Sequence, residues 1–415
     1  MKIAIVGTGV SAMTAAYLLN REHDITVFEQ AGYIGGHTNT VDVQLGGATF
    51  AVDTGFIVFN DWTYPNFCKL IDRLGVAWRG STMSFSVDCE RTGVAYNGGS
   101  IAGLFAQKRN AVSPRFLGML RDILRFNRLA RRFADEGDPA MTMRGFLAMN
   151  GFGAMFEQQY LIPITAAIWS ADPSMLDDFP MRFMAEFLRN HGMLNTWHRP
   201  TWRTITGGSR NYMAKLTEPF ADRIHLNEPV VAVRRAAGGV VVDTTRMACQ
   251  RFDHIVLGCH SDHALALLDS DATDDERAAL SAIPYQPNEA VLHTDVSVLP
   301  ERRSCWAAWN YRIPREPGRP VALTYHMNTL QGLETPEPVC VTLNERDRID
   351  PEKILRVIPY EHPVFGPGRA TAHRLYDKIN HQNGVSFCGA YWGYGFHEDG
   401  VVSALRAVEP FGVSL

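Results

Sequence analysis

The sequence lacks any uninterrupted apolar segment of about 18 or more residues, which excludes an ordinary membrane-spanning helix. Cysteine is also scarce. The seven cysteines are scattered along 415 residues and form no C-x-x-C pair, so we expect reduced thiols in a cytoplasmic protein. A surplus of basic residues is missing too, because the net charge is −4 and the pI is near 6.4. This balance argues against nucleic acid as the main partner.

Two common catalytic motifs are absent as well. The fourteen histidines form no H-E-x-x-H sequence and no ligand spacing with cysteine, so no metal site is expected. No G-x-S-x-G elbow is present, which argues against a serine hydrolase of that type. With 46% hydrophobic residues, the chain can bury a large core, and it is too long for one compact domain. We therefore expect two domains.

The sequence does contain a glycine-rich turn directly after its first apolar segment. Residues 2–6 are typical of a buried strand, and the turn Gly7-Thr8-Gly9-Val10-Ser11-Ala12 leads into an apolar helical stretch. Gly7 permits a tight turn, Gly9 permits close approach of a pyrophosphate, and the helix start offers free N–H groups. Glu29 follows a second expected strand at the distance of a ribose-binding acid. Because the chain starts with this strand, we do not expect a signal peptide.

The segment after Glu29 indicates which dinucleotide is bound. It continues as Gln30-Ala31-Gly32-Tyr33-Ile34-Gly35-Gly36-His37-Thr38, and a strand-like segment then ends in Asp53-Thr54-Gly55. Here the chain resembles the FAD-dependent amine oxidase and phytoene desaturase superfamily. In that superfamily a Gly-Gly-Arg turn covers the pyrophosphate and the ribityl chain. His37 stands where the family usually has Arg or Lys, and a neutral imidazole supplies no fixed charge there.

Three later segments have counterparts in the same superfamily. Residues 206–209 resemble its second Gly-Gly turn, and residues 224–233 resemble the strand that passes the adenine. Residues 386–400, followed by an apolar helix over 401–408, resemble its last motif, in which helix amides face the flavin. The resemblance implies non-covalent FAD and these cofactor-binding residues: Gly7, Gly9, Val10, Ser11, Ala12, Glu29, Gln30, Gly35, Gly36, His37, Thr38, Thr54, Gly55, Phe56, Val230, Val231, Gly389, Trp392, Glu398, Asp399, Gly400 and Val401.

The positions of these motifs predict an interleaved domain order. The expected fold class is α/β, with a Rossmann-like FAD-binding domain of the amine-oxidase type formed by residues 1–60, 200–268 and 366–415. Residues 61–199 and 269–365 form an α+β substrate-binding domain. It combines a helical cap over 61–200 with an antiparallel sheet whose strands are expected at 290–296, 307–311 and 321–327.

Two features of the expected substrate domain bear on the substrate, and each has two interpretations. A helix predicted over 113–136 carries Arg121, Arg125, Arg128 and Arg132 on one face, which is either a solvated surface or a contact with an anionic membrane. A stretch rich in Met and Phe is either ordinary core or the wall of an acyl tunnel. Its residues are Met175, Phe179, Met181, Phe183, Met184, Phe187 and Met193.

The closest resemblance is to a bacterial subgroup of FAD-dependent oxidoreductases found beside cyclopropane-fatty-acid-synthase-like methyltransferases. The segments MKIAIVGTGVSAMTAAYLL, EQAGYIGGHTNTV, DTGFIVFN and GYGFHEDGVVSAL carry it. It implies desaturation of a methylated monounsaturated fatty acyl group of a phospholipid, by hydride transfer to flavin N5, in furan fatty acid synthesis. The enzyme is then expected in the cytoplasm, with peripheral contact at the inner face of the membrane. The alternatives are an amine oxidase, a non-redox fatty acid isomerase, and a flavin-binding partner of the methyltransferase without turnover.

The proton acceptor is expected on the substrate sheet or in the C-terminal aromatic loop, the segments that face the flavin in the resembling fold. Tyr325 and His326 are adjacent in an expected strand, so only one of them can face the flavin. His326 is the predicted base because imidazole titrates near neutral pH, and Tyr391 or Trp392 is expected to shape the pocket.

Overall fold

The computed structural model describes residues 1–169, 178–316, 322–366 and 368–415. Its first half is built on a parallel sheet in the order β10-β2-β1-β14-β20. The strands are short and mostly apolar, as is usual for parallel strands covered on both faces. They are β1 (Lys2–Val6), β2 (Asp24–Phe28), β10 (Ile224–His225), β14 (His254–Leu257) and β20 (Val385–Phe387). All five come from the ranges predicted to form the FAD-binding domain.

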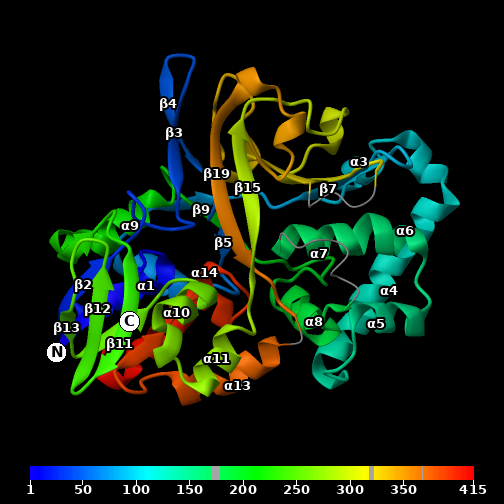
Figure 1. The fold of residues 1–415 in the computed structure, drawn as a ribbon. Coiled ribbons are helices and arrows are strands. Elements are labelled where there is room, and N and C mark those ends of the chain that lie inside the picture. Colours follow the sequence, from blue (N-terminus) through cyan, green and yellow to red (C-terminus); the bar gives the residue numbers. More distant parts are fainter. Residues whose placement is uncertain (170–177, 317–321, 367) are drawn as a thin grey trace.

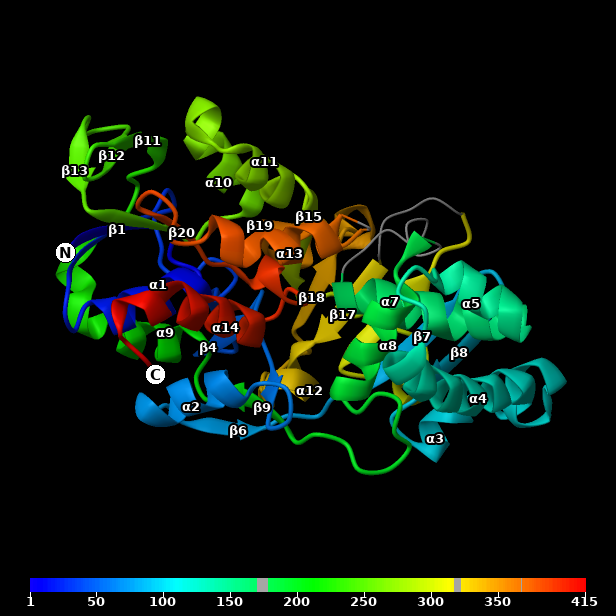
Figure 2. The ribbon, with the colours of Figure 1, turned by 90° about the horizontal axis from the view of Figure 1, so that it is seen from below.

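Helices and a small sheet cover the two faces of this parallel sheet (Figure 2). One face carries α1 (Val10–Leu19), α9 (Arg210–Thr217) and α14 (His397–Val408). The other carries the antiparallel strands β11 (Val230–Ala236), β12 (Gly239–Thr244) and β13 (Gln250–Phe252), together with α10 (Ser261–Leu268). Beside α10, α11 (Asp274–Leu280) packs against α13 (Arg369–Ile379).

The second half is built on a sheet in the order β19-β15-β18-β17-β16-β7-β8. Its neighbouring strands are antiparallel except β16 and β7, which are parallel. The long strands β15 and β19 run side by side through the middle of the molecule (Figure 1). The strands are β7 (Phe85–Cys89), β8 (Val94–Asn97), β15 (Tyr285–His293), β16 (Trp309–Ile313), β17 (Ala322–His326), β18 (Cys340–Leu343) and β19 (Ile354–Pro363).

A helical cap lies beside this second sheet (Figure 1). Its longest helix begins where the hydroxyl of Ser113 accepts a hydrogen bond from the N–H of Phe116 at 3.4 Å. The cap contains α4 (Pro114–Glu136), α5 (Met143–Asn150), α6 (Ala154–Phe156), α7 (Ile162–Trp169) and α8 (Met181–Asn190). The remaining elements are β3 (Thr40–Leu45), β4 (Ala48–Asp53), β5 (Phe59–Asn60), α2 (Pro65–Arg73), β6 (Trp78–Gly80), α3 (Ile101–Leu104), β9 (Trp202–Ile205) and α12 (Met327–Gln331).

This arrangement confirms the predicted fold class, but it differs from the expectation in several elements. β6, β7 and β8 lie in the range expected to be mainly helical, and β7 pairs with β16 in parallel, whereas an antiparallel sheet was expected. Residues 65–73 were placed in the substrate domain, whereas α2 packs on α14 in the core of the nucleotide-binding half. The C-terminal helix was expected to start at Val401 and starts at His397, because Asp399 accepts a hydrogen bond from the N–H of Phe396 at 2.9 Å and closes the first turn earlier. Among the described residues, no helix is long and apolar enough to cross a membrane.

Candidate active site

A cavity of about 1400 Å³ lies between the two halves and is lined by residues of both. This volume exceeds the roughly 300–1,000 Å³ of most small-molecule sites, so it has room for a cofactor and a substrate together. One end reaches the start of α1 and the carboxyl ends of β1 and β2, where nucleotides bind in folds of this kind. The other end reaches the helical cap and β16 and β17.

Hydrogen bonds fix Glu29 at the nucleotide end. The hydroxyl of Thr8 donates to one carboxylate oxygen of Glu29 at 2.6 Å, and the N–H of Ala31 donates to the other at 2.8 Å. The N–H of Gly35 in turn donates to the Thr8 hydroxyl at 3.1 Å. The glycine-rich turn and the Gly35-Gly36 turn are thus tied to the carboxylate.

The start of α1 presents an open anion-binding surface. No side chain caps this helix at Gly9, and a Cβ atom added to Gly9 meets nothing within 4 Å. Free N–H groups at a helix start with open space in front of them suit a pyrophosphate. The residues present therefore fit FAD at its diphosphate and at its adenosine ribose.

Thirteen of the predicted cofactor residues line the cavity: Gly7, Gly9, Val10, Ser11, Glu29, Gln30, Gly35, Gly36, His37, Gly55, Phe56, Val230 and Gly389. Nine do not: Ala12, Thr38, Thr54, Val231, Trp392, Glu398, Asp399, Gly400 and Val401. Ala12 and Gly400 instead permit close packing. A Cβ atom on Gly258 would lie 2.6 Å from the Cβ of Ala12, and one on Gly400 would lie 2.7 Å from Val10.

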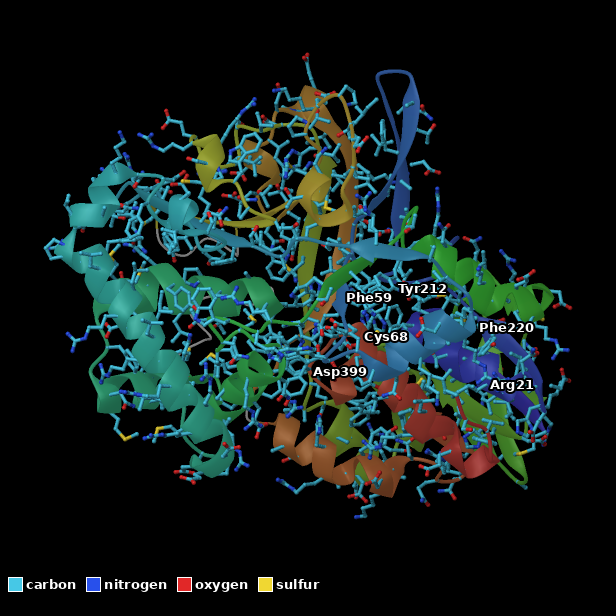
Figure 3. The ribbon with its side chains drawn as sticks, turned by 180° about the vertical axis from the view of Figure 1, so that it is seen from behind. Arg21, Phe59, Cys68, Tyr212, Phe220 and Asp399 are labelled. Carbon is cyan, nitrogen blue, oxygen red and sulfur yellow. The ribbon has the colours of Figure 1, made fainter. Side chains whose placement is uncertain are left out.

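Glu398 and Asp399 accept hydrogen bonds from within the protein and do not line the cavity. Glu398 accepts hydrogen bonds from the backbone N–H groups of Asn66 and Phe67 at 3.1 and 2.9 Å, and so caps the start of α2. Asp399 lies at the end of α14 that faces the second half (Figure 3). Burial raises the pKa of Asp399 to about 6. Because α14 begins at His397, the backbone N–H groups that lack a partner within the helix belong to residues before Gly400.

Three other predicted cofactor residues lie behind the cavity wall. The hydroxyl of Thr38 is 2.6 Å from that of Tyr212, and the hydroxyl of Thr54 is 2.9 Å from that of Tyr360. Trp392 is buried against Tyr376, with 4.7 Å between ring centroids. Tyr360 lines the cavity and Tyr212 does not, but the Thr38 hydroxyl also lies 3.0 Å from Nε2 of His397, which does. Thr38 and Thr54 therefore contact residues of the cavity wall, whereas Trp392 fills core.

His37 faces an aromatic and histidine-rich wall. Its ring stacks on Tyr360 at 4.7 Å and lies 5.2 Å from the ring of His362. Burial lowers the pKa of His37 to about 4, so the imidazole is neutral near pH 7. Its Nε2 atom is buried without a hydrogen-bond partner in the protein. That orphaned nitrogen at the predicted ribityl and pyrophosphate position is consistent with a ligand as its partner.

A second histidine, His397, was not predicted and also lines the cavity. It stacks on Phe56 with 3.5 Å between ring centroids, and its Nε2 is 3.0 Å from both the Thr38 and Tyr212 hydroxyls. Burial holds the pKa of His397 well below its usual range. The sequence signal for it was only its place two residues before Asp399.

Of the three predicted catalytic residues, two line the cavity and one does not. Tyr325 and Tyr391 line the cavity, and burial raises the pKa of both phenols, so both stay protonated. His326 does not line it: its Nδ1 is 2.8 Å from the Thr329 hydroxyl, and its ring packs beside Trp306 at 5.5 Å. The expectation that His326 faces the flavin side does not match this geometry, because Tyr325 takes that side of the strand.

The cavity instead brings another histidine to its substrate end. His191 follows α8 and is 8% exposed, and its Nδ1 lies 3.0 Å from the carbonyl oxygen of Phe187. A carbonyl only accepts, so Nδ1 carries the proton and Nε2 keeps a lone pair. Burial lowers the pKa of His191 to about 4. No sequence motif marks His191, because helix packing brings this residue to the cavity.

The Met and Phe stretch contributes to both core and cavity. Phe187 and Met193 line the cavity, whereas Met181 and Met184 are fully buried in the core of the second half. Met175 lies outside the described residues. The stretch therefore supplies both core residues and residues of the cavity wall.

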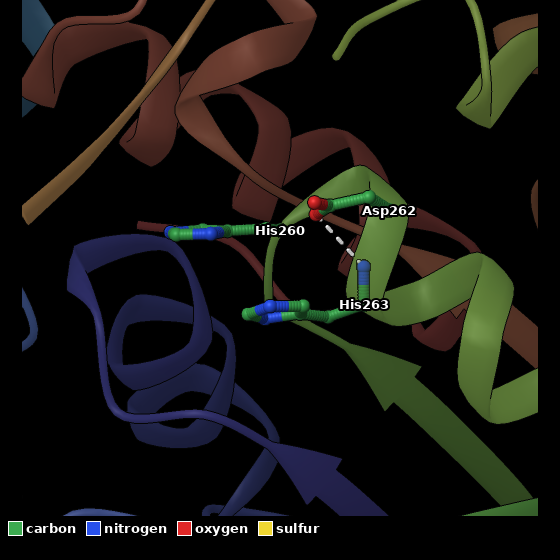
Figure 4. A group of neighbouring side chains, drawn as sticks. All are labelled: His260, Asp262 and His263. Carbon is green, nitrogen blue, oxygen red and sulfur yellow. Dashed lines mark hydrogen bonds between the residues drawn. The ribbon is translucent and has the colours of Figure 1, made fainter. Parts of the chain in front are cut away.

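A polar group at the start of α10 borders the nucleotide end (Figure 4). Potential ligand atoms of His260, Asp262 and His263 lie within 4.8 Å of one another, and Glu361 lies 3.3 Å from His260 Nδ1. The rings of His260 and His263 are stacked, with 5.0 Å between centroids and 17° between planes. An imidazole binds a metal in its own ring plane, so two stacked rings do not converge on one ion. His260, His263 and Glu361 form a polar part of the cavity wall, and Asp262 lies outside the lining.

Comparisons with known proteins agree with this architecture. Curated proteins give no match. Among solved structures, a CLA-producing fatty acid isomerase from P. acnes has 18% identity and a TM-score of 0.71, over 99% of this chain and 98% of that one. Cyclohexylamine oxidase from Brevibacterium oxydans IH-35A has 14% identity and a TM-score of 0.72, over 99% of both chains. Putrescine oxidase bound to putrescine has 15% identity and a TM-score of 0.66, also over 99% of both.

The family model described as flavin containing amine oxidoreductase matches residues 13–327, which is most of the chain. The matched region includes β2 with Glu29, the second Gly-Gly turn and five strands of the second sheet, namely β7, β8, β15, β16 and β17. The chain therefore belongs to the flavin-containing amine oxidoreductase family and is an FAD-dependent oxidoreductase.

Proposed function

We propose that this enzyme desaturates a lipid acyl chain, namely a methylated monounsaturated fatty acyl group of a phospholipid. One observation carries the proposal: the substrate end of the cavity is apolar and aromatic. The described residues that line it include Met83, Phe85, Tyr96, Tyr160, Ile164, Ile168, Trp169, Phe187, Met193, Phe365, Tyr394 and Phe396. Such a surface suits an acyl chain, which needs area and no ionic partner.

The distribution of carboxylates disfavours a cationic amine. Among the described lining residues, the carboxylates are Glu29 and Glu361, and both lie toward the nucleotide end. A buried ammonium group needs a charged or strongly polar partner. Tyr391, Tyr394 and Trp309 line the cavity and keep an aromatic cage for a neutral amine as the second candidate.

The proposed reaction removes two hydrogens from neighbouring positions of an allylic system. FAD supplies a two-electron acceptor that takes a hydride at N5. The other hydrogen leaves as a proton, and the Nε2 lone pair of His191 accepts it. Tyr325 and Tyr391, which stay protonated, shape the pocket and exclude water. A fatty acyl methyltransferase would supply this substrate, and furan fatty acids would be later products.

Anaerobic mixing of the FAD-loaded enzyme with detergent-solubilised substrates tests the proposal. We expect the visible flavin band to bleach with a phosphatidylcholine that carries a methylated monounsaturated chain, and not with cyclohexylamine or putrescine. Bleaching by the amines alone would overturn it in favour of amine oxidation. A lipid product of unchanged mass without net bleaching would identify a non-redox isomerase.

The role of His191 has its own test. His191→Gln should keep its FAD and slow flavin reduction by about 10²-fold, the usual loss when a general base is removed. His373→Gln, in α13 and away from the cavity, is the matched control. Unchanged single-turnover reduction in His191→Gln would exclude His191 as the proton acceptor.

A further inference from the structure

The cavity has a mouth at its substrate end. Thr82, Gly98, Gly99, Arg199 and Thr201 all line the cavity and are all exposed, so the cavity reaches the surface there. The nucleotide end opens separately at Gln30, Tyr33, His263 and Glu361. A substrate can therefore enter without passing the cofactor.

Exposed tryptophans gather on the segments that form the substrate mouth. Three of the eight tryptophans are exposed, namely Trp62, Trp78 and Trp197, at 36%, 41% and 84%. We call these three residues the tryptophan rim. The other five are buried or partly buried. Tryptophan is costly to expose to water, so a concentration of exposed tryptophans at one opening points to a partner surface.

Hydrogen bonds tie the rim segments to the mouth. The carboxylate of Asp61, next to Trp62, accepts a hydrogen bond from the N–H of Thr201 at 2.9 Å. The N–H of Ser81, after the strand that carries Trp78, donates to the carbonyl of Trp202 at 2.9 Å. The ring of Trp62 lies 4.8 Å from that of His198, the neighbour of Trp197. The rim is thus part of the same small sheet and loop that frame the opening.

The charges beside the rim are mainly positive. The segments 60–64, 78–84, 98–101 and 192–203 contain Arg79, Arg199 and Arg203 and a single carboxylate, Asp61. Arg203 lies 4.0 Å above the ring of Trp78 and 3.9 Å from Asp61. Indole rings beside arginines match the interface of an anionic bilayer, where the ring sits at the headgroup level and the cation faces phosphate.

We propose that the tryptophan rim docks this enzyme on an anionic lipid bilayer, with the mouth of the cavity against the membrane. The inference rests on the proposed function in one respect, since a phospholipid substrate explains why the opening faces lipid. An acyl chain then passes from the bilayer into an apolar cavity without crossing water. The docking surface differs from the arginine face of α4, where Arg121, Arg128 and Arg132 are exposed and Arg125 binds Asp122 at 3.7 Å.

Co-sedimentation of the FAD-loaded full-length enzyme with vesicles tests the docking. Vesicles of phosphatidylglycerol and phosphatidylcholine in equal parts are compared with pure phosphatidylcholine, and neither contains a methylated chain. The double variant Trp62→Ala/Trp197→Ala should bind the anionic vesicles on the order of tenfold more weakly, because two large apolar rings are lost. Met247→Ala, an exposed apolar residue in the turn between β12 and β13, should bind as the wild type does.

The charge reversal Arg121→Glu/Arg128→Glu separates the two surfaces. Wild-type binding by the tryptophan variant, or loss of binding only in the arginine variant, would overturn the proposal. So would a wild-type enzyme that binds neither vesicle. Trp197→Phe, which keeps an aromatic ring, should retain most of the binding, and an unchanged flavin spectrum shows that each variant is folded.

The two experiments distinguish failure of the docking proposal from failure of the proposed function. Flavin bleaching by detergent-solubilised lipid with no vesicle binding would overturn the docking and leave the function standing. Vesicle binding that depends on Trp62 and Trp197, with no bleaching by any lipid, would support the docking and overturn the function.

Discussion

Glu29 is oriented by the protein itself, through the Thr8 hydroxyl and the Ala31 N–H. Glu29→Ala removes the ribose acceptor and also the bonds to Thr8 and Ala31, so it should weaken FAD binding. Each charge-assisted hydrogen bond to the ribose is worth about 1.5–3 kcal/mol, so affinity should fall by roughly tenfold or more. Fluorescence of FAD released on dilution measures this. Glu29→Gln, which keeps one acceptor, should lie between the two, and wild-type FAD affinity in Glu29→Ala would contradict the ribose assignment.

Residues of the nucleotide end were predictable because their geometry is local. A strand, a glycine turn and a helix start follow one another in the first 19 residues, and Glu29 ends the next strand. His191, Tyr360 and His397 were not predictable, because each reaches the cavity through the packing of elements distant in sequence. Tyr325 and His326 show what the alternation of a strand does not predict. Alternation says that they face opposite sides, but both sides of β17 are covered, so hydrophobicity does not say which one faces the cavity.

At the scale of elements, α14 connects the cofactor region to α2. Glu398 accepts two backbone N–H groups at the start of α2 and also the side-chain amide of Asn66 at 2.7 Å. Glu398→Ala leaves these donors without a partner, and loss of a helix cap typically costs about 0.5–2 kcal/mol. The free energy of unfolding in urea should fall by this amount. Glu409→Ala, an exposed acid just after α14, should change it by less than about 0.5 kcal/mol.

A Glu398→Ala variant as stable as the wild type would show that water replaces the cap. The sequence indicated an acidic pair before an apolar helix at this point, and it placed the pair at the flavin. In the structure, Glu398 accepts a hydrogen bond from the start of α2, and Asp399 accepts one from the N–H of Phe396. Sequence motifs predict that a helix exists better than they predict its first residue, because the first turn depends on side-chain partners from other parts of the chain.

At the scale of the whole molecule, the two halves come from interleaved parts of the chain. The parallel sheet uses residues before 29, between 224 and 257 and after 384, and the second sheet uses residues between 85 and 97 and between 285 and 363. The sequence predicts interleaved segments because the motifs typical of the first half recur at three separate places along the chain. The cavity was not predictable, because it is enclosed by side chains from both halves.

Histidine burial in both halves predicts acid sensitivity. Burial lowers the pKa of seven histidines to about 4 or about 3, and it holds the pKa of an eighth, His397, well below its usual range. They are His37, His191, His254, His260, His293, His362, His373 and His397. Unfolded histidine takes up a proton near pH 6.5, whereas these sites stay neutral until the pH is well below that value. Between the unfolded and the folded pKa values the unfolded chain binds more protons, so the free energy of unfolding falls as the pH falls.

Two buried carboxyls oppose this trend. Burial raises the pKa of Asp53 and of Asp399 to about 6, so the folded protein takes up those protons before the unfolded chain does. Their effect is to stabilise the fold as the pH falls from 6 toward 3.8, but two groups do not offset eight. Each histidine that stays neutral in the folded protein lowers the free energy of unfolding by up to about 1.4 kcal/mol for each pH unit of acidification. A few such histidines suffice to cancel a total stability of about 5–15 kcal/mol.

We therefore expect the urea midpoint, measured with saturating FAD, to fall steeply from pH 7.5 to pH 5.5. His293 offers a matched test, because it is fully buried, bonded to the Thr342 hydroxyl at 2.7 Å, and outside the cavity lining. His293→Gln removes one titrating group, so its midpoint should depend less steeply on pH even if the variant is less stable at pH 7.5. A wild-type midpoint that stays constant or rises on acidification would show that these histidines gain protons while folded, which their burial argues against.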